Sequence, residues 1–300
     1  MTENLESDYL RRVTAVDHTR FLPGTSIEIV HDWPAEAKPT HAVFDFDGTI
    51  SLVREGWPQI MVPMMVESLQ ETGTTETAEQ LSEIAMTFVM ELCGKQTIYQ
   101  MIRLAEEVEK RGKPAEDPLV YKHRYLDALL ARIKSRREGL ANGSIDPDDF
   151  LVPFARPLLE ELHRRGVQMF LASGTEVEDV REEARLLQVD RYFGKHIYGA
   201  VENYTSFSKQ MVIEQILREN QLSGTQLIGF GDGYVEIDNV KQAGGLAIAV
   251  ASDETNRSGK PDQWKRDRLL GVGADVVIPD FHDYESLCAW IYDRKGEPGA

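Results

Sequence analysis

The stretch HAVFDFDGTI, residues 41–50, decides the fold. It begins with a short apolar run, of the kind that forms a strand buried on both faces of a parallel sheet. The run ends in two aspartates, Asp45 and Asp47, followed by Gly48. A buried carboxylate is costly unless it is paired or bound to a metal. The pair therefore indicates a functional site, although a simple strand-end turn uses the same residue types.

Other apolar runs repeat this pattern along the chain and alternate with helical stretches. Strands are predicted at 25–30 (an edge strand), 167–173, 227–232, 246–251 and 274–279. Helices are predicted at 155–165, 176–187, 209–220, 235–243 and 283–292. Strands that alternate with helices form βαβ units. The sequence therefore predicts an α/β fold with a doubly wound, Rossmann-like parallel sheet.

Residues 56–139 do not follow this alternation, because they contain no convincing strand. Their apolar residues recur at helical intervals and predict four helices, at 57–72, 76–92, 96–111 and 118–137. We therefore predict an all-helical cap inserted into the core. The predicted parts are an N-terminal arm (1–40), the core (41–55 and 150–300) and the cap (56–149).

The overall composition narrows the class of protein. The chain has 300 residues, 42% of them hydrophobic and 28% charged, which is typical of a globular protein. Its net charge of −17 repels nucleic acid and anionic membranes, so a phosphate site must be locally positive. The two cysteines are too few for a disulfide framework. No signal peptide or membrane span is seen, so we expect a cytoplasmic protein.

Chemically useful side chains follow several of the predicted strands. Ligands of open α/β sheets bind beyond the carboxyl ends of the strands, so we expect these side chains to meet at one edge. Carboxylates suit a hard cation, while a hydroxyl, backbone N–H groups and a lysine suit an oxyanion. The set consists of Asp45, Asp47, Ser173, Gly174, Lys209 and Asp232.

In this order and spacing, four short motifs resemble those of the haloacid dehalogenase (HAD) superfamily, in its phosphatase-type branch. They are DFDGT (45–49), LASGT (171–175), SFSKQ (206–210) and GDGYVE (231–236). The helical insertion resembles the C1-type cap of that superfamily. The resemblance covers roughly residues 41–280 and leaves the N-terminal arm unexplained.

The resemblance implies a role for each matching position. Asp45 is expected to attack phosphorus and form an aspartyl-phosphate, and Asp47 to act as general acid and then as base. Asp45, Asp232 and the backbone carbonyl of Asp47 are expected to bind Mg²⁺. The phosphoryl oxygens are expected to contact Ser173, Gly174 and Lys209.

One position departs from the pattern of the superfamily. The last motif often reads Gly-Asp-x-x-x-Asp, and here its final place is Glu236. The longer side chain is expected to reach the water around the metal rather than the metal itself. A surface position on the helix is the alternative.

Several matching residues also have plainer explanations. Ser173 and Gly174 alone would suit a helix N-cap, and Lys209 alone a solvated surface. In the cap, Lys95, Gln96, Tyr99 and Arg103 gather near one helix start and are candidates to contact the leaving group. A solvated helix face is the alternative there. The apolar run 57–66 is expected to pack within the cap, with a pocket wall as the alternative.

The function that fits these observations is a Mg²⁺-dependent phosphatase acting on a small phosphorylated metabolite, such as a sugar phosphate. A phosphomutase would use the same aspartyl-phosphate, and a phosphometabolite-binding protein would keep the fold without turnover. Neither nucleic acid nor membrane is an expected partner. The sequence leaves the substrate and the oligomeric state open.

Overall fold

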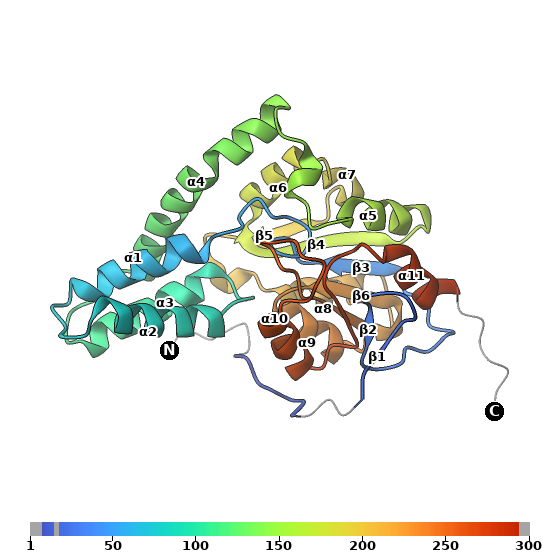
Figure 1. Cartoon of the computed structure of the whole chain (residues 1–300), viewed down its shortest axis with the longest axis horizontal. Coiled ribbons are helices and arrows are strands. Elements are labelled where there is room, and N and C mark those ends of the chain that lie inside the picture. Colours follow the sequence, from blue (N-terminus) through green and yellow to red (C-terminus); the bar gives the residue numbers. More distant parts are fainter. Residues whose placement is uncertain (1–7, 15–17, 294–300) are drawn as a thin grey trace.

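A computed structural model describes residues 8–14 and 18–293 of the chain. In this part of the chain, helices pack on both faces of a mostly parallel eight-stranded sheet, as Figure 1 shows. The strand order is β1-β2-β8-β7-β6-β3-β4-β5. The strands are β1 (Arg20–Phe21), β2 (Glu28–Ile29), β3 (His41–Phe44), β4 (Gln168–Glu176), β5 (Ile197–Ala200), β6 (Leu227–Gly231), β7 (Leu246–Val250) and β8 (Val276–Ile278).

The central strand β3 pairs in parallel with β4 on one side and β6 on the other. Across the sheet, the strands β5, β4, β3, β6, β7 and β8 all pair in parallel. Only β1 and β2, at the other edge, pair antiparallel with their neighbours. This confirms the predicted α/β fold. The short strands β1 and β5 were not predicted from the sequence, because two and four residues give too little alternation to detect.

Side chains of β3 alternate between two apolar layers, as the pleat of a strand requires. Ala42 and Phe44 face one layer, and Val43 faces the other. The first layer holds α5 (Ala155–Arg164), α6 (Val177–Leu186), the short α7 (Asp190–Phe193) and α11 (Tyr284–Cys288). The second holds α8 (Lys209–Glu219), α9 (Tyr234–Gln242) and α10 (Gln263–Gly271). The sheet is therefore covered on both faces.

Of the α-helices between β3 and β4, α5 packs on the sheet and the other four project to one side of it (Figure 1). They are α1 (Pro58–Gln70), α2 (Ala78–Glu91), α3 (Thr97–Lys110) and α4 (Pro118–Asn142). Local signals fix several of their ends: Thr77 caps α2 in a capping box, Asp117 caps α4, and Gly143 ends α4 with φ 74°. We call this segment the helical insertion. The predicted domain boundaries stay a prediction.

The described part of the N-terminal segment packs along α10. The backbone N–H groups of Arg12 and Val13 both donate to Gly271 O, and Tyr9 meets the ring of Tyr234 edge-on at 5.5 Å. The guanidinium of Arg268 lies 4.1 Å from the Tyr9 ring centre. Of the predicted arm (1–40), residues 1–7 and 15–17 lie outside the described residues, as does the C-terminal segment 294–300.

None of the helices in the described part of the chain combines the length and the apolar character that a membrane span needs. The two cysteines are both free thiols, one at the pocket and one in the core.

Candidate active site

The loop that follows β3 is tightly wound and carries both aspartates. The backbone N–H of Asp45 donates to Phe230 O at 2.9 Å, and Gly48 N donates to Ser51 O at 2.9 Å. Gly48 has φ 76°, and a Cβ there would lie 2.2 Å from Oδ2 of Asp232. Only glycine suits both the conformation and the close approach. The loop thus brings the first motif against the aspartate that follows β6.

Asp45 is buried and paired with a lysine. Its side chain accepts a hydrogen bond from Phe46 N at 2.8 Å and lies 2.8 Å from Lys209 Nζ. Burial raises the pKa of Asp45 well above its usual value, the Lys209 ammonium lowers it, and the charges of Glu236 and Asp232 raise it further. Asp45 therefore pairs with one ammonium in a crowded anionic site, and its predicted role as nucleophile stays a prediction.

Lys209 starts α8 and is buried between two carboxylates. Its Nζ lies 2.8 Å from Oδ2 of Asp45 and 2.8 Å from Oε2 of Glu236. Burial alone would lower the pKa of Lys209, but the two carboxylates raise it above its ordinary value, so the side chain stays an ammonium. The alternative of a solvated surface lysine is wrong.

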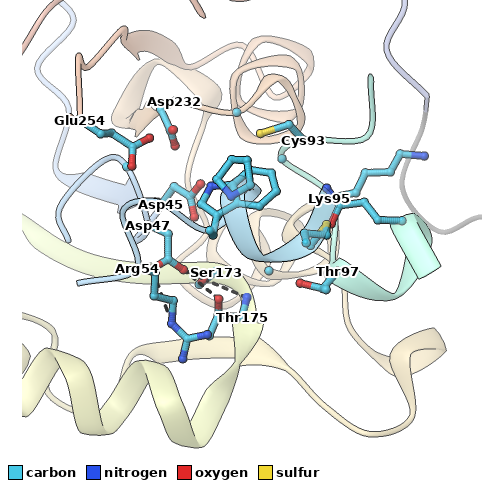
Figure 2. Close-up of a pocket in the computed structure, with 18 of the residues that line it drawn as sticks. Asp45, Asp47, Arg54, Cys93, Lys95, Thr97, Ser173, Thr175, Asp232 and Glu254 are labelled. Carbon is cyan, nitrogen blue, oxygen red and sulfur yellow. Dashed lines mark hydrogen bonds and ion pairs between the residues drawn. The ribbon is translucent and has the colours of Figure 1, made fainter. Parts of the chain in front are cut away.

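Asp47 points into the pocket toward β4, as Figure 2 shows. Its Oδ2 accepts from Thr175 Oγ1 at 2.8 Å and from Ser173 Oγ at 3.5 Å. Burial raises the pKa of Asp47, while the Arg54 guanidinium, whose Nε lies 4.0 Å from Oδ1, lowers it. Buried Oδ1 accepts no hydrogen bond from the described residues. One oxygen of Asp47 is therefore available to a ligand.

The carboxylates fit a divalent cation. Oxygens of Asp45, Asp232 and Glu236 all lie within 4.8 Å of one another. Hard cations such as Mg²⁺ prefer carboxylate and carbonyl oxygens, and Asp47 lines the same pocket. These carboxylates support the predicted site for a divalent cation. The identity of the cation stays a prediction.

Glu236 has two partners, one for each of its oxygens. Oε1 accepts from Gly233 N at 2.6 Å and Oε2 from Lys209 Nζ at 2.8 Å. The side chain occupies the space beside Gly231, where a Cβ would lie 2.1 Å from its Cγ. Glu236 therefore caps the first turn of α9 and holds the lysine, and the alternative of a surface position is wrong.

Ser173 and Gly174 lie within β4 rather than at its end. The strand continues to Glu176, where it pairs with Ala200 of β5 after a register shift. Because α6 begins only at Val177, neither residue caps a helix, and the predicted strand end at 173 was too early. Both line the pocket, with Ser173 buried. Their predicted role in binding phosphate stays a prediction.

The loop between α2 and α3 closes the insertion onto the core. A Cβ at Gly174 would lie 3.1 Å from Lys95 O, and a Cβ at Gly94 would lie 3.2 Å from Gly233 Cα. The side chain of Gln96 is buried and donates from Nε2 to Phe207 O at 2.8 Å. The insertion therefore touches the segments around three of the four motifs.

The predicted substrate contacts in the insertion need correction. Lys95 lines the pocket, but its side chain extends away from the two aspartates, and its Nζ lies 2.6 Å from Oδ1 of Asp8 (Figure 2). Gln96 points into the contact with the core instead of the pocket. Arg103 lies half-exposed about two turns further along α3, where it pairs with Glu107. The structure does not bring Gln96 or Arg103 to the pocket wall.

The pocket has a volume of about 270 Å³ and lies between the insertion and the carboxyl ends of the strands. The core supplies its charged side, and the insertion supplies most of its apolar side. The run 57–66 contributes both to the wall and to the packing of the insertion. The apolar wall consists of Trp57, Pro58, Met61, Met90, Tyr125, Leu126 and Leu129.

Sequence reasoning missed several charged or polar pocket residues, four of which lie beside the motif aspartates. Arg54 and Thr175 contact Asp47, while Glu254 and Lys265 lie beside Asp232. Thr175 is part of the LASGT motif, but no role was predicted for it. The other three stand in no motif, and α10, which carries Lys265, gave only a weak apolar pattern in a stretch of charged residues.

The fold and this carboxylate-lined pocket define an α/β enzyme with a helical insertion over its active site. A family model described as haloacid dehalogenase-like hydrolase matches residues 39–244, more than half of the chain. The chain belongs to this family and is a hydrolase, which confirms the resemblance and the prediction of an enzyme. A search of curated proteins found no match.

Solved structures with the same fold come from several bacteria. β-Phosphoglucomutase from Clostridium difficile has a TM-score of 0.56 and 12% identity, over 84% of this chain and 97% of that one. A predicted phosphoglycolate phosphatase from Haemophilus somnus has a TM-score of 0.52 and 15% identity, over 83% of this chain and 97% of that one. CbbY from Rhodobacter sphaeroides, in complex with xylulose-1,5-bisphosphate, has a TM-score of 0.51 and 18% identity, over 81% of this chain and 95% of that one. At these identities the likeness shows the fold alone.

Proposed function

We propose that this hydrolase is a Mg²⁺-dependent phosphatase that acts on a small phosphorylated metabolite through an aspartyl-phosphate on Asp45. The observation that carries the proposal is the buried Asp45–Lys209 pair at 2.8 Å, with Asp47 nearby on the same pocket. Phosphoryl transfer to an aspartate requires three groups: a carboxylate nucleophile, a fixed ammonium beside it, and a second carboxyl group that acts as general acid.

The first step is attack of an Asp45 oxygen on phosphorus, while Asp47 gives its proton to the leaving oxygen. Burial raises the pKa of Asp47 and so favours the protonated form that a general acid needs. Thr175 orients the acid through its hydrogen bond at 2.8 Å. In the second step Asp47 takes a proton from water, which attacks phosphorus and frees Asp45.

The negative charge of the phosphoryl group needs fixed partners. Lys209, the Ser173 hydroxyl and the N–H of Gly174 are the proposed donors to its oxygens. Mg²⁺ would be held by Asp45, Asp232 and the carbonyl of Asp47. When bound, the cation favours the ionised form of Asp45 and neutralises charge on the phosphoryl oxygens.

The leaving group would lie against the helical insertion. A cavity of about 270 Å³ with an apolar wall suits a small metabolite better than a phosphoprotein. The insertion loop that carries Gly94 and Gln96 packs on the core and would exclude bulk water during the reaction.

Phosphate release from a panel of phosphorylated metabolites tests the proposal. We expect release with Mg²⁺, none with a chelator, and none from Asp45→Asn. Asp127→Asn, an exposed position on α4, is the matched control and should keep full activity. Isomerised sugar phosphate without release would favour a phosphomutase, and tight phosphate binding without either product would favour a binding protein.

A further inference from the structure

A second lysine lies at the candidate metal site, outside every motif described above. Lys265 stands in the first turn of α10, where Asp262 caps the helix by accepting from Lys265 N at 2.9 Å. Its side chain is only 12% exposed and reaches the pocket. It lies beyond residue 244, where the match to the family model ends.

The ammonium of Lys265 is fixed by three acceptors, one for each of its N–H bonds. Nζ lies 2.8 Å from Asp232 Oδ2, 3.0 Å from Ser252 Oγ and 2.7 Å from Glu254 Oε1. Figure 2 shows Asp232 and Glu254 next to each other at one side of the pocket. The charge of this otherwise flexible side chain is therefore held at one point.

The same group is tied to the loop that carries the nucleophile. Ser252 donates from Oγ to Gly48 O at 2.6 Å, and Thr49 donates from Oγ1 to Asp232 Oδ1 at 3.2 Å. Any movement of the ammonium away from Asp232 would have to break contacts on both sides. Its position relative to the carboxylates is thus part of the folded structure.

An ammonium beside a carboxylate ligand opposes a cation that binds through the same carboxylate. The two positive charges would share Asp232, in a partly buried site where the effective dielectric is well below that of water. Glu254, on the far side of the ammonium, reduces this repulsion. Groups that hydrogen-bond a metal ligand typically change metal affinity by about tenfold or more. For Lys265 the direction of the change follows from its positive charge, which repels the cation.

We propose that Lys265 weakens the binding of the divalent cation in the free enzyme, and that Glu254 limits this effect. The proposal rests on the function proposed above, and it makes Lys265 a residue that acts through Asp232 rather than on the substrate. A phosphate dianion brings negative charge to the same pocket. The affinity of the enzyme for the cation should therefore be higher when phosphate is bound, and its affinity for phosphate higher when the cation is bound.

Calorimetric titration of the full chain with Mg²⁺ alone tests this without any turnover. K265M should bind Mg²⁺ at least tenfold more tightly than the native chain. K265R keeps the charge and should stay within about threefold, while E254Q should bind at least threefold more weakly. K260M, at an exposed position of the same segment, is the matched control. Inorganic phosphate should tighten Mg²⁺ binding by the native chain more than by K265M.

Two outcomes would overturn the proposal. If K265M binds Mg²⁺ more weakly than the native chain, the lysine only orients Asp232. If K265M binds Mg²⁺ as tightly as the native chain, the ammonium has no effect on the cation. If K265M does not fold, E254Q decides, because unchanged or tighter Mg²⁺ binding there contradicts the charge argument. Failure of the proposed function is distinguishable, since the native chain would then release no phosphate, whereas the Mg²⁺ affinities of K265M and E254Q are measured without any turnover.

Discussion

Replacement of Glu236 by glutamine tests how the site holds Lys209. The carboxylate is 4% exposed and serves two buried donors, Gly233 N at 2.6 Å and Lys209 Nζ at 2.8 Å, with one oxygen each. Glutamine offers a single oxygen, so one donor would face an NH₂ group. A hydrogen bond to a charged group contributes about 1.5–3 kcal/mol, and a buried unsatisfied donor costs about 1–3 kcal/mol.

Because Lys209 keeps its bond to Asp45, the lower half of the combined range applies, and we expect Glu236→Gln to lose about 2.5–4 kcal/mol of unfolding free energy. For a chain of 300 residues that corresponds to a fall in Tm of roughly 4–6 °C. The change also removes a negative charge that raises the pKa of Asp45, so the acid limb of kcat/KM should move to lower pH.

Thermal unfolding followed by circular dichroism measures the first effect, and phosphate release between pH 4 and pH 8 measures the second. Glu219→Gln, an exposed position at the end of α8, removes the same charge and should shift Tm by less than 2 °C, roughly the effect of a surface change. A Tm for Glu236→Gln equal to that of this control would refute the account of two buried donors that depend on one carboxylate.

Other predictions follow from single contacts. Thr175→Val removes a hydrogen bond that lowers the pKa of Asp47, so the alkaline limb of the pH–rate profile should move to higher pH, whereas Thr175→Ser should not move it. Gly231→Ala places a Cβ 2.1 Å from Cγ of Glu236 in the same motif, so phosphate release should fall at least tenfold, and native-like activity would contradict the packing. Arg268→Met removes the hydrogen bond to Glu91 O, the last residue of α2, so limited proteolysis should cut the helical insertion faster, and an unchanged rate would rule out this anchor.

Much of the fold could be predicted because its signals are local. The four helices of the insertion have clear apolar periodicity, and the buried strands are continuous apolar runs bounded by glycine or aspartate. The helix α10 could not be predicted in this way, because Trp264 and a run of charged residues interrupt its apolar face. Tertiary contacts with β7 and the N-terminal segment stabilise it instead.

The candidate site could be predicted in part, for a similar reason. Asp45, Asp47 and Asp232 follow strands, and the topology of a parallel sheet brings strand ends together. The partners of these residues depend on distances that no spacing encodes. Arg54 reaches Asp47 from the loop just before the insertion, and Lys265 reaches Asp232 from a helix that follows one further strand, β7.

The charge of the pocket explains why a chain of net charge −17 would need a cation to bind phosphate. Among the described residues, six carboxylates and four cationic side chains line the pocket, and three of those cations already pair with carboxylates of the same wall. Fixed positive charge therefore does not by itself offset a phosphate dianion there. By number, the carboxyl groups exceed the cationic side chains by two. This balance makes a cation that arrives with the phosphate, rather than a permanently positive pocket, the arrangement that suits this site.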